Sequence, residues 1–129
     1  MSREHKIPGP DHPISIEPHE GRVTVRVAGT LVADTTAALS LQEADYPAVL
    51  YIPRADVVDS RLVRTETATY CPYKGDASYY TVEAEDGTVV EDAIWSYEQP
   101  FPEVGEITGH VAFYPRHAEF AESAEGAEA

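Results

Sequence analysis

Residues 22–33 read Arg-Val-Thr-Val-Arg-Val-Ala-Gly-Thr-Leu-Val-Ala, and this stretch decides the fold class. Valine occupies every second position from Val23 to Val27, and arginine or threonine occupies the positions between. Successive side chains of a β-strand point to opposite faces, so this alternation predicts a strand that is buried on one face. Gly29-Thr30 interrupts the alternation before a second apolar run begins. The stretch therefore predicts an antiparallel hairpin.

Short segments of strand character continue along the rest of the chain. They cover residues 49–52, 62–70, 78–84, 88–97 and 110–114. Asp86-Gly87 is a strong hairpin signal, and residues 55–60 predict a helical turn or loop. Residues 35–42 fit either a strand, which we favour, or a short helix, and the segment 110–114 has the same two options. Many short strands separated by Gly and Pro turns predict an all-β fold of the barrel or sandwich type.

The composition divides the chain into three parts. A chain of 129 residues is long enough for one domain with a sizeable core. Residues 1–20 contain four prolines and three histidines, and they predict an extended arm that lies over the domain or is partly disordered. Residues 21–116 form the expected domain. Residues 117–129 are rich in alanine and glutamate and predict an acidic tail that is frayed or weakly helical.

The charge of the chain limits its partners. The formal net charge is −14, with nine basic residues scattered among 23 acidic ones, so no basic stripe is available to neutralise phosphates. We therefore predict no nucleic-acid partner and no membrane partner. The apolar runs are too short for a transmembrane helix or a signal-peptide core, and a single cysteine fits a reducing compartment. These features favour the cytoplasm.

The unusual chemistry of the chain is concentrated in residues 69–80, Thr-Tyr-Cys-Pro-Tyr-Lys-Gly-Asp-Ala-Ser-Tyr-Tyr. This segment holds the only cysteine, Cys71, four of the eight tyrosines, and Lys74, which is one of two lysines. Pro72 and Gly75 predict a loop between two strands. A lysine beside a thiol and several tyrosines suggests a polar, aromatic site.

Cys71 and Lys74 each have a reactive and a structural interpretation. Cys71 is a nucleophile if the nearby lysine favours its thiolate, but a catalytic cysteine also needs a base. Its more common role is that of a small buried hydrophobe. Lys74 binds a carboxylate or phosphate as a point charge, or it forms a salt bridge with Asp76, Asp92 or another carboxylate.

Five aromatic residues and one arginine are further candidates for a binding site. The aromatic residues are Tyr51, Tyr70, Tyr79, Trp95 and Tyr97. Small-molecule pockets are mainly apolar with a few placed polar groups, a mixture that these residues supply, although the same residues also build ordinary β cores. Arg54 follows a predicted strand and is a candidate for a bidentate anion contact. Its structural alternative is a pair with Asp34 or Asp56.

Known metal and phosphate motifs are absent from the sequence. The five histidines lack metal-ligand spacing, and neither of the common Gly-rich phosphate loops is present. A two-metal nucleotidyltransferase needs closely spaced carboxylates, and no Asp-x-Asp pair is found among Asp34, Asp56, Asp59 and Asp92. We predict no metal and no cofactor.

Several blocks of the sequence resemble the domain of unknown function 427 family. The blocks are Val32-Ala-Asp34, Tyr51-Ile-Pro-Arg54, residues 69–75 with Ser78-Tyr-Tyr80, Ala93-Ile-Trp-Ser-Tyr97 and Val111-Ala-Phe-Tyr-Pro115. They occur in the expected order over about residues 21–116. The resemblance implies a β-tent-like fold, in which two antiparallel sheets lean together around a concave pocket. The family is sometimes labelled nucleotidyltransferase-like. Related β-tent proteins often carry a zinc knuckle of paired cysteines, which this chain cannot build with one cysteine.

The residues and the resemblance lead to one principal hypothesis and two alternatives. The principal hypothesis is a small soluble protein that binds an unidentified small organic molecule in a pocket lined by tyrosine and tryptophan. Lys74 and Arg54 would supply polar or anionic contacts, and Cys71 would lie at the wall. The alternatives are an enzyme with Lys74 or Cys71 as its reactive group, and a protein-interaction module. Exposed sheet edges need a cover, so a homodimer is a further expectation.

Overall fold

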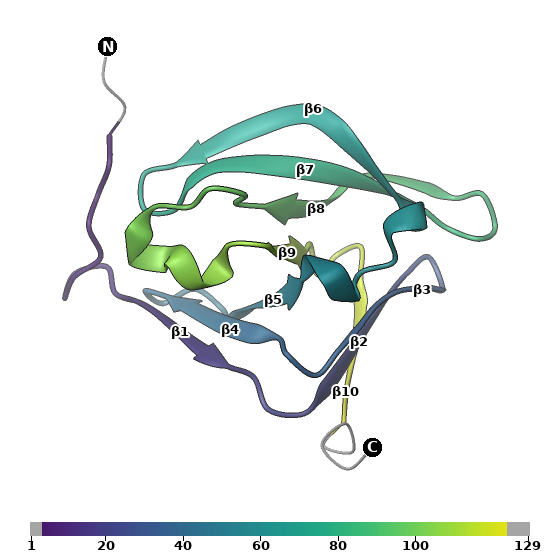
Figure 1. Ribbon diagram of the computed structural model, residues 1–129, viewed down its shortest axis with the longest axis horizontal. Coiled ribbons are helices and arrows are strands. Elements are labelled where there is room, and N and C mark those ends of the chain that lie inside the picture. Colours follow the sequence, from purple (N-terminus) through teal and green to yellow (C-terminus); the bar gives the residue numbers. More distant parts are fainter. Residues whose placement is uncertain (1–3, 124–129) are drawn as a thin grey trace.

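A computed structural model describes residues 4–123, which form two antiparallel β-sheets (Figure 1). The larger sheet has seven strands in the spatial order β1-β4-β5-β9-β8-β7-β6. Its strands are β1 (Ile14–Pro18), β4 (Leu39–Glu43), β5 (Val49–Pro53), β6 (Leu62–Cys71), β7 (Gly75–Glu83), β8 (Val89–Ser96) and β9 (His110–Phe113). Two 3-10 turns, η1 (Arg54–Asp56) and η2 (Asp59–Arg61), connect β5 to β6.

The smaller sheet contains the hairpin that the opening stretch predicts. Its spatial order is β10-β2-β3, with β2 (Arg22–Val27), β3 (Thr30–Thr35) and β10 (Glu119–Ser123). The turn residues Ala28 and Gly29 have φ angles of 49° and 79°. Positive φ at both central residues is what a tight turn needs to match the twist of its flanking strands. The predicted hairpin is therefore confirmed.

Adjacent residues of the larger sheet belong to two separate hydrophobic clusters, one on each face. Ile52, Ile94 and Val111 pack in a cluster that also holds valines of β2 and β3. Their neighbours along the strands, including Tyr51 and Ala112, belong to a second cluster that holds no described residue of the small sheet. Because side chains alternate along a strand, the small sheet covers one face of the large sheet only.

A third 3-10 segment, η3 (Pro102–Ile107), covers part of the other face. Its buried residues, Val104 and Ile107, pack in the same cluster as Tyr51. In Figure 1 the large sheet curves around η3, with β8 on one side of it and β4 on the other. This curvature makes the face beside η3 concave.

The structure decides the segments whose conformation the sequence left open. Residues 39–43 and 110–113 are both strands, and residues 55–60 contain the expected helical turns. The prediction of a frayed or weakly helical tail is wrong for Glu119–Ser123, because this segment pairs with β2 and completes the small sheet. The remainder of the predicted tail, residues 124–129, lies outside the described residues.

The prediction of an all-β fold with two antiparallel sheets is confirmed, and helical structure in residues 4–123 is limited to short 3-10 turns. Part of the predicted arm is also a strand, since β1 pairs along its whole length with β4. No helix in the described part of the chain is both long and apolar enough to cross a membrane.

Candidate functional site

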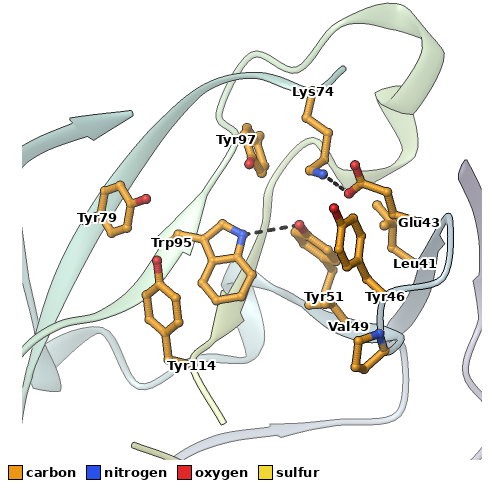
Figure 2. Close-up of a pocket in the computed structure, with 11 residues that line it drawn as sticks. Leu41, Glu43, Tyr46, Val49, Tyr51, Lys74, Tyr79, Trp95, Tyr97 and Tyr114 are labelled. Atoms are coloured by element: carbon orange, nitrogen blue, oxygen red, sulfur yellow. Dashed lines mark hydrogen bonds and ion pairs between the residues drawn. The ribbon is translucent and has the colours of Figure 1, made fainter. Parts of the chain in front are cut away.

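A cavity of about 240 Å³ opens on the concave face of the large sheet (Figure 2). Six aromatic side chains line it together with an acidic and a basic residue. The lining residues are Leu41, Glu43, Tyr46, Pro47, Val49, Tyr51, Lys74, Tyr79, Trp95, Tyr97 and Tyr114. They come from β4, β5, β7 and β8 and from the loops that follow β4, β6, β8 and β9. The site is therefore assembled from segments that lie far apart in the sequence.

Strand register explains why these aromatic residues share one face. Tyr79 of β7 lies directly opposite Trp95 of β8, and Trp95 lies opposite Ala112 of β9. Ala112 and Ala77 are buried on this face and have small side chains. The large aromatic rings therefore surround two alanines whose side chains occupy little volume. This difference in size leaves space above the sheet.

The charged part of the site is a chain of three side chains that runs from the arm to the cavity. Lys74 Nζ forms an ion pair with Glu43 Oε1, and His12 Nε2 lies 2.7 Å from Glu43 Oε2. The side chains of Lys74 and Glu43 are 9% and 16% exposed. His12 is stacked on Tyr73, with ring centroids 4.0 Å apart and an interplanar angle of 7°. The arm thus contributes a residue that holds the carboxylate of the site.

The loop between β6 and β7 turns sharply to direct Lys74 inward. Gly75 has a φ of 112°, a conformation that L side chains rarely adopt. The carbonyl of Lys74 accepts a hydrogen bond from the Phe101 amide at 3.0 Å, and the amide of Lys6 donates to the Pro72 carbonyl at 2.9 Å. The loop is therefore held by the chain before η3 and by the arm.

Two opposing effects act on the Glu43 carboxyl. Burial raises its pKa, while hydrogen bonds from Lys74 and His12, and their positive charge, lower it. The lowering effects prevail, and the pKa of Glu43 lies below its ordinary value. Glu43 is therefore a carboxylate at neutral pH, and Lys74 has its counter-charge in place.

Three tyrosines of the site, Tyr51, Tyr97 and Tyr114, have raised pKa values and carry neutral hydroxyl groups. Burial is the main cause that raises the pKa values of Tyr51 and Tyr97, and burial with the nearby Tyr79 hydroxyl raises the pKa of Tyr114 to about 12. The Trp95 indole nitrogen donates to Tyr51 Oη at 3.3 Å, and the hydroxyl of Tyr79 is 2.8 Å from that of Thr69. The hydroxyl of Tyr97 makes no hydrogen bond within residues 4–123. It is therefore available to a bound molecule.

The structure brings five of the eight predicted site residues to the cavity. They are Tyr51, Lys74, Tyr79, Trp95 and Tyr97. Cys71 is half-buried and packs against the same hydrophobic cluster without lining the cavity. Tyr70 lies away from it as well, since its hydroxyl donates to the Glu4 carbonyl and its ring meets Phe101 edge-on.

Arg54 is also outside the cavity, so it cannot supply an anion contact there. Its guanidinium pairs with Asp59, and it lies 5.5 Å from the centroid of the Tyr80 ring. The alternative partners that the sequence suggested, Asp34 and Asp56, are bound elsewhere: Asp34 pairs with Arg22, and Asp56 accepts from Thr35. η1 directs Arg54 toward η2, away from the concave face.

Sequence reasoning missed four charged or aromatic residues of the site, His12, Glu43, Tyr46 and Tyr114, and the apolar lining residues Leu41, Pro47 and Val49. A signal for Glu43 was present, because it continues the alternation of Leu39 and Leu41 and so falls in phase with apolar residues. A charged residue at such a position needs a buried partner. No comparable signal pointed to His12, whose place depends on the pairing of β1 with β4.

Metal binding finds no support in the described residues. No group of three or more His, Cys, Asp or Glu side chains within residues 4–123 has an arrangement that could hold a metal ion. The aspartates considered for a two-metal site have protein partners, as Asp92 shows by accepting from Thr65 and Thr67 at 2.7 Å each.

Comparison with known proteins agrees with the resemblance that the sequence blocks carry. No curated protein matches this chain. A family model described as a domain of unknown function, DUF427, matches residues 15–124. This match includes β10 and all of β1 except Ile14, and both strands lie outside the blocks that carry the resemblance. The chain therefore belongs to the DUF427 family.

Proposed function

We propose that this protein binds a small organic molecule in the cavity lined by tyrosine and tryptophan. One observation carries the proposal: six aromatic side chains and a buried ion pair converge on open space, on a sheet face that the second sheet leaves uncovered. Ligand pockets typically combine aromatic walls with a few placed polar groups.

The contrast with an ordinary hydrophobic core supports this reading. The cluster between the sheets is built from aliphatic side chains, Phe113 and little else. On the concave face, hydroxyls and an ammonium group border space that remains open. Burying polar groups beside unfilled space does not improve packing, so a binding role accounts better for their presence.

The size of the cavity limits the ligand. Its volume of about 240 Å³ lies below the range of roughly 300–1,000 Å³ usual for pockets of drug-sized molecules. A molecule of one or two rings fits such a space. Tyr46 is 62% exposed and marks the open side, where a larger substituent can extend into solvent.

The test uses Trp95, the only tryptophan of the chain, as an internal reporter. A metabolite library is screened by thermal shift, and hits are titrated by Trp95 fluorescence. We expect hits whose affinity falls about tenfold or more in Tyr97→Leu and stays unchanged in Tyr70→Phe, a matched tyrosine outside the cavity.

Trp95 also borders a second, more apolar cavity beside Leu50 and Phe120. Phe120→Ala is therefore the control for binding at that place. Hits that weaken in Phe120→Ala and keep their affinity in Tyr97→Leu would contradict the proposal, and so would a screen without hits.

An enzyme that uses the same cavity is a second candidate, favoured by the chain from His12 through Glu43 to Lys74. A carboxylate between an imidazole and an ammonium group can pass a proton from the arm to the cavity. Incubating each hit with the protein and following it by mass spectrometry tests this candidate. Conversion that is lost in His12→Asn, while binding is kept, would support an enzyme.

A further inference from the structure

The charges at the cavity restrict the chemical class of its ligand. We infer that the cavity selects uncharged ring molecules that carry hydroxyl or amide groups, and that it discriminates against carboxylates and amines. This inference rests on the proposed function and specifies the ligand of the same site. Its basis is that the two charged side chains that line the cavity, Glu43 and Lys74, pair with each other inside the protein.

Glu43 and Lys74 are the only two charged side chains among the described residues that line the cavity, and they pair with each other. Figure 2 shows the ammonium group of Lys74 directed at the Glu43 carboxylate, beside the rings of Tyr46 and Tyr51. A ligand therefore meets a pair with no net charge.

The pair is held in place from both sides. The imidazole of His12 binds the second carboxylate oxygen of Glu43, and stacking on Tyr73 limits the movement of this imidazole. Lys74 Nζ lies 5.8 Å from the centroid of the Tyr97 ring, within the range of a cation–π contact. Neither charge can turn toward a ligand without losing these contacts.

A charged ligand has to break the pair in order to be neutralised. A carboxylate that takes Lys74 leaves Glu43 buried with His12 alone, and an amine that takes Glu43 leaves Lys74 without a counter-charge. Separating a buried ion pair is costly because the group left behind loses a charged partner and does not regain its water. An uncharged ligand avoids this cost.

The opposite end of the cavity, beside Tyr114, has no charged residue in its described lining. Arg116 lies 5.0 Å from the centroid of the Tyr114 ring. Arg116 is exposed and does not line the cavity. What the remaining wall offers is ring faces and neutral hydroxyls such as that of Tyr97. These groups suit a ring with hydroxyl or amide substituents, which can both donate and accept hydrogen bonds.

The experiment uses matched probes on the full chain. The panel holds ring molecules that each occur as a carboxamide, a carboxylate and an aminomethyl compound, for example benzamide, benzoate and benzylamine. Trp95 fluorescence and ligand-observed NMR give affinities at neutral pH. We expect the carboxamides to bind at least tenfold more tightly than their charged partners, and displacement by a hit from the metabolite screen to place them in the cavity.

Two variants move the preference in opposite directions. Glu43→Gln frees the charge of Lys74 and is expected to improve carboxylate binding at least tenfold. Lys74→Met frees Glu43 and is expected to improve binding of the aminomethyl compounds. Arg116→Gln, which removes a cation outside the cavity wall, is the matched control and should change neither preference. Circular dichroism checks folding, and the two variants test the inference independently if one of them unfolds.

The outcomes separate this inference from the proposed function. Equal or tighter binding of the charged probes by the wild-type protein overturns the inference and keeps the binding role. A panel without binders overturns it as well if the metabolite screen still yields hits at the cavity. Unchanged preferences in both folded variants overturn the part assigned to the ion pair.

Discussion

The two faces of the large sheet differ in chemistry although the same strands build both. On the face toward the small sheet, Ile52 and Ile94 are fully buried among aliphatic side chains. On the concave face, their neighbours Tyr51 and Trp95 border a cavity and a buried ion pair. We call these the core face and the site face.

The difference shows how one sheet separates stability from binding. Each strand alternates between the two faces, so a single residue step changes the expected effect of a substitution. Core-face side chains contribute mainly through buried apolar area. Site-face side chains keep polar groups beside open space, and most of their contribution should appear when a ligand is bound.

The largest expected effect is that of Ile52→Ala on the core face. Ile52 is fully buried, and removing its side chain leaves a cavity between the sheets. We expect a loss of about 2–5 kcal/mol in the free energy of unfolding, measured by urea denaturation. Ligand affinity at low temperature, where the variant is folded, should stay within about twofold of wild type. A loss below about 1 kcal/mol would show that the core face does not carry the stability.

The next effect concerns the ion pair of the site face. Glu43→Gln leaves Lys74 buried without its counter-charge, and we expect a loss of about 3 kcal/mol, the low end of the range for broken buried pairs. Glu91→Gln, a substitution of an exposed glutamate, is the control and should change stability by less than about 0.5 kcal/mol.

A double variant sharpens this result. Replacing the whole pair in Glu43→Leu/Lys74→Met removes both charges together, and the loss should be smaller than in Glu43→Gln. An equal or larger loss in the double variant would mean that the pair itself, and not the charge left behind, stabilises the fold.

Much of the fold could be predicted from the sequence because its signals are local. Alternation in residues 22–27 and the turn at Gly29 define the hairpin of the small sheet, and Asp86-Gly87 lies in the connection between β7 and β8. The strand at Glu119–Ser123 was not predicted because alanine and glutamate, which make up three of its five residues, are depleted in strands. Pairing with β2 overrides that local preference.

The sequence predicted the site residues that can be recognised by residue type alone. It did not predict those whose position depends on the pairing of distant segments. Tyr51 and Trp95 were found because large aromatic residues are candidates on any concave sheet. The partner of Lys74 was not found. Glu43 lies 31 positions away in the sequence, and only the order of the strands in the sheet brings the two residues together. The wrong prediction for Arg54 has the same cause, because its conformation in η1 turns its side chain toward Asp59.

A smaller effect concerns the dependence of stability on acid. The folded-state pKa of Glu43 lies below its ordinary value of 4.5, so its contribution to stability is fully present above about pH 4.5 and is lost as the pH falls through the folded-state value. Wild type should therefore lose more stability than Glu43→Gln between pH 6 and the acid limit. Asp34 and Glu98, whose pKa values are also lowered, are present in both proteins and cancel in the comparison. Parallel acid limbs in thermal melts would contradict this prediction.

The smallest expected change in stability is that of Tyr97→Phe. This variant tests whether a polar group of the site face contributes to ligand binding without contributing to the stability of the fold. The Tyr97 hydroxyl has no hydrogen-bond partner in the described part of the chain, so its removal should change the free energy of unfolding by less than about 0.5 kcal/mol. Tyr79→Phe, which removes a hydroxyl bonded to Thr69, should cost about 1 kcal/mol and serves as the comparison. Ligand titrations by Trp95 fluorescence should show the reverse order, with the larger loss of affinity in Tyr97→Phe. If Tyr97→Phe instead destabilises the free protein more than Tyr79→Phe, its hydroxyl serves the fold, and the site face is a second core.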